Sequence, residues 1–274
     1  MSALFYYSLA LSSWKESQGN RWSLRVNPSS GNLHPTEAYL IAPGITNLSE
    51  TGGVYHYQSL LHQLERRCHL EAGDWKKLVG ILGGKDVQDE PVFFVALSSI
   101  HWRESWKYGE RAFRYCQLDI GHAVAAITIS ALMLGWRVRQ LEGASSRLIS
   151  ELAGLEREQD FETPQEREFS ELLLMITPAP DPVFDSGLNK LPDESPIIHQ
   201  TWMGKANRLS CEHHPWPWID RIAKACLKPP SQRISQCANP LKKTAKTPMT
   251  PKISRFAEPE NWFVKGAALL LWMG

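Results

Sequence analysis

Apolar residues recur at helical spacing in two parts of the chain. Leu4, Tyr7 and Leu11 follow one another at steps of three and four, so residues 3–17 are predicted to form an amphipathic helix. Residues 110–134 carry apolar side chains at steps of three, four and seven, and their second half is apolar almost all round. That pattern is typical of an interior helix, so we expect a long buried helix there.

Other stretches alternate apolar and polar residues, or are apolar throughout, as β-strands are. Alternation and a Gly52-Gly53 turn predict a hairpin over residues 37–57, and the apolar run 91–98 predicts a buried central strand. Two further strands are expected at residues 137–141 and 172–177. Short helices are expected to begin at Leu60, at Trp75 with Asp74 as its N-cap, at Ser145 or Ser146, and at Pro217.

The chain of 274 residues is long enough for one large domain with an appendage. Prolines cluster after Thr177, so the compact domain is expected to cover residues 1–185. Residues 186–228 are predicted to be a Pro-rich connector with a short helix. Residues 229–274 are predicted to be a flexible basic linker with an atypical apolar terminus.

Composition narrows the class of protein. Hydrophobic residues make up 43% and charged residues 22%, which indicates a globular protein. The net charge of +1 provides no electrostatic case for binding nucleic acid or an anionic membrane. The sequence shows no apolar run of spanning length and no basic n-region of a signal peptide. Five scattered cysteines without a Cys-x-x-Cys pair fit reduced thiols, so we expect a cytoplasmic protein.

The densest turn signal lies between Arg25 and Tyr39. It combines two prolines with short polar side chains and a glycine that permits positive φ: Pro28, Ser29, Ser30, Gly31, Asn32 and Pro35. Hydroxyls, amides and backbone N–H groups before a strand suit a ligand rich in acceptors. Arg25, just upstream of them, could bind an anion. On local physics alone, an ordinary tight connection is favoured over a binding loop.

A second candidate is the pair Lys107-Tyr108, just before the long helix. A side-by-side ammonium and phenol can hold an anion or move a proton, although a solvated Lys beside a packed Tyr is the ordinary alternative. The first turns of that helix carry further polar residues, including Asp119 and His122. Burying such groups without partners costs about 1–3 kcal/mol each, so they need partners or a polar cavity.

A third candidate is the turn at Gly143-Ala144, whose backbone N–H groups could face a ligand, although a plain turn is favoured. The sequence has no Gly-x-Gly-x-x-Gly, no Walker loop and no Gly-x-Ser-x-Gly elbow. The stretch Cys211-Glu-His213-His214 lacks a second ligand group at metal-binding spacing, so no metal site is expected.

Three stretches, in this order and spacing, resemble SagB-type dehydrogenases, a branch of the FMN-dependent nitroreductase superfamily. They are Pro-Ser-Ser-Gly-Asn-Leu-His-Pro-Thr-Glu-Ala-Tyr at 28–39, Val-Tyr-His-Tyr at 54–57, and the stretch from Lys107 to His122. The group Leu209, Trp216, Pro217, Ile219 and Asp220 resembles the connector of tandem-domain members, so the chain resembles the first half of such a member.

The resemblance implies an α+β, nitroreductase-like fold: a mainly antiparallel central sheet wrapped by helices around a long buried helix. It implies FMN as cofactor, contacted by Ser29, Ser30, Gly31 and Asn32 with Arg25 nearby, and by the backbone of Gly143 and Ala144. It also implies hydride transfer to flavin N5, with Lys107 or Tyr108 as the catalytic group that handles the proton, as in azoline oxidation.

The partners implied are a small-molecule or modified-peptide substrate, NAD(P)H as a candidate electron donor, and a second copy in a homodimer that shares the flavin. Small residues Gly121, Ala125 and Ala126 would let another helix approach closely. Two alternatives stay open at this point. One is a non-catalytic flavin- or partner-binding domain, and the other is a hydrolase with a reactive serine.

Overall fold

The structure is a computed structural model that describes residues 1–83, 91–178 and 191–230. The described residues belong to one compact unit, Met1–Arg233. Of the linker and terminus predicted for 229–274, all but the first two residues lie outside the described ranges.

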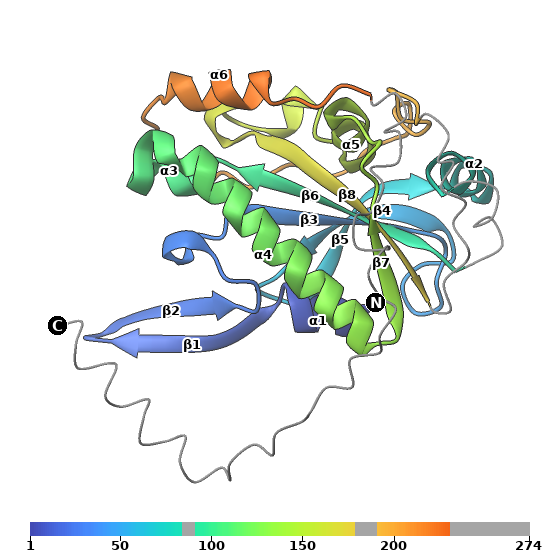
Figure 1. Cartoon of the computed structure of the whole chain (residues 1–274), viewed down its shortest axis with the longest axis horizontal. Coiled ribbons are helices and arrows are strands. Elements are labelled where there is room, and N and C mark those ends of the chain that lie inside the picture. The colour runs from blue at the N-terminus through green and yellow to red at the C-terminus, as the bar shows by residue number, and fades with distance from the viewer. Residues whose placement is uncertain (84–90, 179–190, 231–274) are drawn as a thin grey trace, which may run out of the picture. The chain divides into compact units, whose positions relative to one another are not determined.

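A six-stranded antiparallel sheet forms the centre of the protein, with strand order β5-β4-β3-β6-β8-β7 (Figure 1). This confirms the predicted hairpin, the buried central strand and the two later strands. The strands are β3 (Thr36–Ala42), β4 (Gly52–Gln58), β5 (Gln63–Leu70), β6 (Phe93–Ile100), β7 (Trp136–Gln140) and β8 (Glu168–Pro178).

Strand β5 corrects the prediction of a helix beginning at Leu60. The residues that follow alternate, with Leu64, Cys68 and Leu70 more buried than the charged residues between them. They pair with β4 from Gln58↔Gln63 to Gly52↔Leu70. Because β4 presents an unpaired edge, a neighbouring strand satisfies backbone groups that a surface helix would leave unpaired.

The predicted helix over residues 3–17 is also wrong. Helix α1 covers only Ser2–Ser8, and a separate two-stranded hairpin follows, formed by β1 (Leu11–Ser17) and β2 (Asn20–Arg25). Gln18 and Gly19 both have positive φ, 50° and 78°, as a two-residue hairpin turn of matching twist requires. The hairpin extends away from the central sheet in Figure 1.

Helices cover both faces of the sheet. Helix α4 (Ala112–Met133) crosses one face with α1, as Figure 1 shows, and its Ile120 and Ile127 share a buried cluster with Leu40 and Val95 of the sheet. The other face is covered by α2 (Ala72–Leu82) and α5 (Ser146–Ala153). The remaining helices are α3 (Trp102–Tyr108), α6 (Pro217–Ala225) and the short 3-10 turns η1 (Ser30–Asn32), η3 (Gly109–Arg111), η4 (Glu158–Asp160) and η5 (Pro164–Glu166).

Of two predicted helix N-caps, one is confirmed and the other is wrong. The Ser145 hydroxyl accepts the Leu148 amide at the start of α5, as predicted. Helix α2 begins after Glu71, one turn before Trp75, so Asp74 is not its N-cap. Asp74 lies in the first turn and accepts a hydrogen bond from Gln200 instead.

Helix α4 is buried on one side only, which corrects the expectation of burial all round. Its exposed side carries the apolar residues Leu118, Ile129, Leu132 and Met133. The stretch Trp102–Met133 is long and apolar enough to cross a membrane by length and composition alone, a test that a helix packed in a protein core also passes. Its packing against the sheet gives the apolar content a structural role in the fold.

Residues from 191 onward add to the core. Leu191, Ile197 and Trp202 are buried in the cluster between the sheet, α2 and α5, and Trp202 forms a β-bridge with Cys68. The Trp202 ring closes over Gly154, where a Cβ would lie 2.4 Å from a ring carbon. The residues that follow, from Gly204 to Asn207, line a cavity together with Glu37 and His56.

Candidate functional site

The loop of Ser29 and Ser30 is tied to a buried carboxylate on α4. The Ser29 hydroxyl donates to Asp119 Oδ2 at 2.6 Å, and the Ser30 amide and hydroxyl donate to Asp119 Oδ1 at 3.0 and 3.1 Å. Asp119 is fully buried, and these bonds supply the partners that a buried carboxylate needs. For Asp119, the structure confirms that polar residues near the start of the long helix find partners.

The loop keeps its shape through its own side chains. Gly31, Asn32 and His34 have positive φ of 59°, 61° and 52°. The Asn32 amide group donates to the Ser23 carbonyl at 2.7 Å, and Asn32 Oδ1 lies 2.8 Å from His34 Nε2. The His34 backbone amide donates to Ser29 Oγ at 2.8 Å. Short polar residues at these positions therefore stabilise a conformation that most residues avoid.

Gly31 contacts the Lys107-Tyr108 pair at the end of α3. A Cβ placed on Gly31 would lie 2.4 Å from Tyr108 Oη and 2.9 Å from Lys107 Nζ. The loop and the pair, predicted separately from the sequence, therefore meet at one place. Lys107 Nζ lies 5.3 Å from the centroid of the Tyr108 ring, and Tyr115 packs on that ring at 4.6 Å between centroids.

The groups at this contact offer a mixed set of donors and acceptors. The donor hydrogens of both serines are used by Asp119, whereas the Ser30 oxygen retains acceptor capacity. The Lys107 ammonium provides donors, and the Tyr108 hydroxyl can donate and accept. An isoalloxazine ring presents carbonyl oxygens, ring nitrogens and one N–H, so the residues present fit a flavin.

Arg25 lies beside this site but is engaged by the protein. Its Nη1 donates to the Thr36 carbonyl at 3.2 Å. Burial lowers the pKa of Arg25, and the nearby carboxylate of Glu37 acts in the opposite direction. Among the described residues, Glu37 is the carboxylate whose charge acts on the Arg25 guanidinium.

The turn at Gly143-Ala144 belongs to another part of the fold. Ala144 is buried in the core cluster on the α5 side, and its amide donates to the Leu141 carbonyl at 3.0 Å. A Cβ on Gly143 would contact Leu191 at 3.5 Å. Within the described residues, no hydrogen bond joins this turn to the Ser29–Asn32 loop. Its contribution to a ligand would therefore come from Gly143 rather than from Ala144.

Sequence reasoning missed a buried carboxyl next to the site. Glu104 on α3 is fully buried, and neither of its side-chain oxygens has a hydrogen-bond partner among the described residues. Burial and the charge of Asp119 raise the pKa of Glu104 to about 8, and the charge of Lys107 opposes the shift. The spacing of three residues between Glu104 and Lys107 on one helix was the available signal.

Sequence reasoning also missed a charged network centred on Glu37 of β3. Glu37 forms ion pairs with Arg103 and with His56, whose Nε2 lies 2.7 Å from the carboxylate. Arg103 also donates to the His34 carbonyl at 2.8 Å, so it joins this network to the loop. Burial alone would raise the pKa of Glu37, but Arg103 and His56 hold this pKa well below its usual range. The spacing of charges along the sequence shows no sign of this pairing.

The two histidines that follow Cys211 in the sequence contact different aromatic residues. His213 Nε2 lies 2.6 Å from Glu166 Oε1, and its ring packs on Trp102 at 4.8 Å. His214 packs on Trp216 instead. The two histidines therefore serve separate contacts.

Comparisons with known proteins agree with this fold. Over 108 residues, or 39% of the chain, the protein is 28% identical to a Methanocaldococcus jannaschii protein described as a nitroreductase. The crystal structure of an Anabaena variabilis protein that is described as a nitroreductase superposes on this chain with a TM-score of 0.52. The two sequences are 23% identical, and the superposition covers 75% of this chain. An Escherichia coli microcin synthetase complex bound to a truncated precursor superposes less well, with a TM-score of 0.48, 18% identity and 66% of this chain covered.

The match is partial in length. This chain spans 52% of the archaeal relative, 43% of the cyanobacterial chain and 63% of the microcin synthetase chain. No protein-family model matches the sequence. The fold is nitroreductase-like: an α+β arrangement with a six-stranded antiparallel sheet and a long helix across it, as predicted.

Proposed function

We propose that this protein binds FMN and acts as an oxidoreductase of the SagB type. The observation that carries the proposal is the contact of Gly31 with Tyr108 Oη and Lys107 Nζ, because it unites the candidate flavin loop with the candidate catalytic pair. Bound FMN would supply hydride acceptance at N5. The chain's own residues would bind the cofactor, orient it and handle the proton.

Each residue at the contact has a distinct role in this proposal. Ser30 Oγ would accept a hydrogen bond from the ligand, while Asp119 keeps the loop in place from below. Lys107 Nζ or Tyr108 Oη would take the proton released as the substrate is oxidised. Arg25, Ser29, Asn32 and the backbone of Gly143 remain proposed cofactor contacts.

The substrate class follows from the same resemblance. We propose a small molecule or modified peptide, such as an azoline that becomes an azole, with NAD(P)H as a candidate electron donor. The four described cysteines are free thiols, which supports the proposed cytoplasmic location.

A flavin titration tests the cofactor. The purified protein is mixed with FMN, and its visible spectrum and thermal unfolding are recorded. We expect perturbed flavin bands and a midpoint that rises with FMN concentration, because a ligand that binds only the folded state stabilises it. Absence of both effects would contradict the proposal that the protein binds FMN. Bound FMN that neither NAD(P)H nor an azoline substrate reduces would favour the non-catalytic alternative.

Substitution of the pair tests the chemistry. Lys107→Ala and Tyr108→Phe should retain FMN but lose turnover by about 100-fold or more, the usual contribution of general acid–base catalysis. Lys77→Ala on α2 and Tyr7→Phe on α1 are matched controls, because both residues are exposed and lie on other helices. Variants of the pair that turn over like these controls would show that it is structural.

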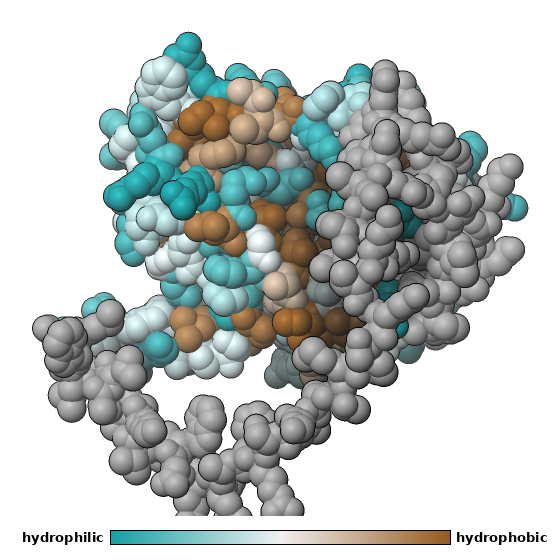
Figure 2. Space-filling view, in the orientation of Figure 1, coloured by the Kyte–Doolittle hydropathy of each residue, from teal (hydrophilic) through white to brown (hydrophobic). Residues whose placement is uncertain are grey.

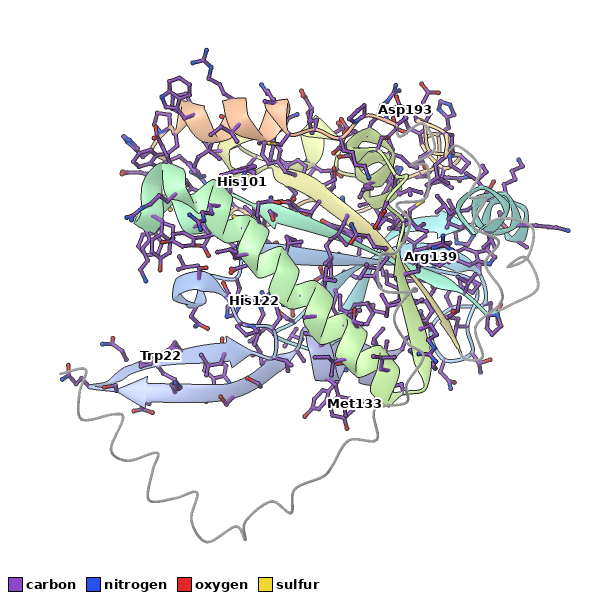
Figure 3. The ribbon with its side chains drawn as sticks, viewed as in Figure 1. Trp22, His101, His122, Met133, Arg139 and Asp193 are labelled. Carbon is purple, nitrogen blue, oxygen red and sulfur yellow. The ribbon has the colours of Figure 1, made fainter. Side chains whose placement is uncertain are left out.

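We also propose a homodimer formed through the exposed side of α4. Hydrophobic residues gather along this helix (Figure 2), and Ile129 and Met133 are 60% and 72% exposed. A Cβ on Gly121 would meet nothing within 4 Å, so a second helix has room to approach there. The β1–β2 hairpin carries exposed Trp22, which lies away from the helix end at Met133 (Figure 3).

Light scattering tests the dimer. Leu132→Glu should convert a dimer of about 62 kDa, twice the 31.1 kDa chain, into a monomer, because it would bury a charge in the interface. Leu61→Glu, at another exposed apolar position far along the sequence, is the control. A flavin-loaded protein that is monomeric at 31.1 kDa would contradict the shared-site arrangement.

A further inference from the structure

Helix α3, which ends on Lys107 and Tyr108, has only seven residues. A helix of this length is marginal in water on its own, so contacts with the rest of the fold must hold it in place. Arg103 supplies one such contact, because it donates to the His34 carbonyl at 2.8 Å. Residues 209–216, which we call the clasp segment, contact both ends of the same helix.

The clasp segment begins on a buried carboxylate. Glu166 of η5 accepts the backbone amide of Leu209 at Oε2 and that of Ser210 at Oε1, each at 2.8 Å. His213 Nε2 lies 2.6 Å from the same Oε1. These three contacts satisfy the carboxylate that burial removes from water, and they fix the path of the first half of the segment.

The start of α3 is attached to this fixed half. Trp102, the first residue of the helix, is buried, and its Nε1 donates to Ser210 Oγ at 2.7 Å. Its ring also packs on the His213 ring, with 4.8 Å between centroids. Because Glu166 holds both Ser210 and His213, the first turn of α3 is joined through the clasp segment to η5.

The end of α3 is covered by the last residue of the clasp segment. A Cβ placed on Gly109, directly after Tyr108, would lie 3.0 Å from Trp216 Cη2. Gly109 has φ of 58°, and its amide donates to the Ser105 carbonyl at the end of the helix. The Trp216 ring therefore packs on the turn that ends α3, at a position where both the backbone and the ring favour glycine.

Trp216 is held from its own side by helix α6. The Ile219 amide donates to the Trp216 carbonyl at 2.9 Å, Ile219 is buried, and α6 contacts α4. The Trp216 Nε1 is buried and has no hydrogen-bond partner among the described residues. Burying an N–H group in this way costs free energy, so packing of the ring, and not a hydrogen bond of its N–H, keeps Trp216 over Gly109.

We propose that the clasp segment positions Lys107 and Tyr108 for proton transfer, with Trp216 as the positioning residue at the turn after Tyr108. The proposal rests on the proposed function of that pair. The segment holds α3 at Trp102 and at Gly109, so the pair at the end of the helix keeps its contact with Gly31. Trp216 acts through the backbone of α3 and takes no part in the chemistry itself.

Hydrogen exchange measured by mass spectrometry tests the positioning without any turnover. In Trp216→Ala, the amides of residues 106–109 should exchange about tenfold faster or more, because local opening of the helix end becomes easier. Exchange in α5 should stay as in the parent. Trp218→Ala is the matched control, because Trp218 is an exposed tryptophan of the neighbouring helix α6. Equal exchange of residues 106–109 in Trp216→Ala and Trp218→Ala would overturn the proposal.

A second pair of variants keeps the test valid if Trp216→Ala fails to fold. Ser210→Ala and Trp102→Phe each remove the hydrogen bond between these two side chains. Each should speed exchange at the start of α3 about two- to tenfold, as loss of one hydrogen bond predicts. The double variant should behave like either single variant, because both remove the same bond. Parent-like exchange in both single variants would contradict the clasp.

Kinetics with FMN and a thiazoline-containing peptide separate positioning from binding. Trp216→Ala should lower kcat by about 10- to 100-fold, because a small displacement of a catalytic group is costly. FMN affinity and KM should stay within about threefold, because Asp119 still anchors the flavin loop. Trp216→Phe, which keeps an aromatic ring over Gly109, should restore most of kcat. A parent-like kcat in Trp216→Ala would overturn the proposal. A parent without turnover would contradict the proposed function, and hydrogen exchange would then decide the clasp by itself.

Discussion

Asp119 on α4 accepts both the backbone amide and the hydroxyl of Ser30, across a separation of 89 residues in the sequence. The carboxylate is fully buried, and it also accepts the Ser29 hydroxyl. One side chain therefore fixes the loop on which the proposed cofactor contacts lie. The geometry of the site therefore depends on this tertiary contact as well as on the loop's own turn residues.

Asp119→Asn is expected to destabilise the protein by about 2–3 kcal/mol. The substitution replaces a carboxylate that accepts three donors with an amide whose NH₂ group must face a donor. Chemical denaturation measures the change, and FMN affinity should fall with it. Asp220→Asn, at an exposed position in the first turn of α6, should cost less than about 1 kcal/mol. An Asp119→Asn variant as stable as Asp220→Asn would show that the anchor is dispensable.

Gly31→Ala is expected to cost about 1–3 kcal/mol and to displace Tyr108. The residue has φ of 59°, and a Cβ would lie 2.4 Å from Tyr108 Oη. Gly73→Ala in α2 is the matched control, because a Cβ there meets nothing within 4 Å and alanine favours a helix.

A double variant separates the two causes. Tyr108→Phe removes the oxygen, and the next Tyr108 atom lies 3.2 Å from the Cβ position. Gly31→Ala should therefore cost less in the Tyr108→Phe background than in the parent. Identical costs in both backgrounds would exclude the Tyr108 hydroxyl as a cause of the loss.

Stability should fall as pH rises from about 6.5 to 9 because of His56. Burial lowers the pKa of His56, but hydrogen bonds to Glu37 and Glu65 and the charges of Glu37 and Glu168 outweigh burial and raise it to about 9. A raised folded pKa contributes stability below the unfolded value of about 6.5, and the contribution is lost as pH passes the folded value. The loss should be about 3 kcal/mol, measured by urea unfolding across this range. In His56→Gln the slope should flatten, and an unchanged slope would exclude His56 as its source.

Glu104→Gln should increase stability near pH 8. The pKa of Glu104 is raised to about 8 by burial and by Asp119, so the unfolded state releases a proton between about pH 4.5 and 8 that the folded state retains. The parent should therefore lose stability across that range, whereas the neutral isostere should not. We expect a gain of about 1–3 kcal/mol over the parent at pH 8 and none at pH 4. Glu110→Gln, an exposed neighbour, is the control.

The sequence alone determined the parts of the fold whose signals are local. The apolar run of β6 and the alternation of β3 and β4 predicted strands because a buried strand needs apolar side chains on both faces or on one. The spacing of apolar residues predicted α4, and the cluster of Pro, Ser, Gly and Asn predicted the loop at Gly31.

Tertiary structure decided what depends on partners far along the chain. The period of Leu4, Tyr7 and Leu11 fits a helix, yet residues 11–25 form a hairpin because Gln18 and Gly19 adopt the turn that lets β1 and β2 pair. Strand β5 forms because β4 presents backbone groups to it. The anchoring of Ser30 by Asp119, the pairing of Glu37 with Arg103 and His56, and the hydrogen bond from Ser98 to Glu168 all join residues distant in sequence. Burial in three dimensions sets the cost of leaving such groups unpaired, and spacing along a sequence contains no record of that burial.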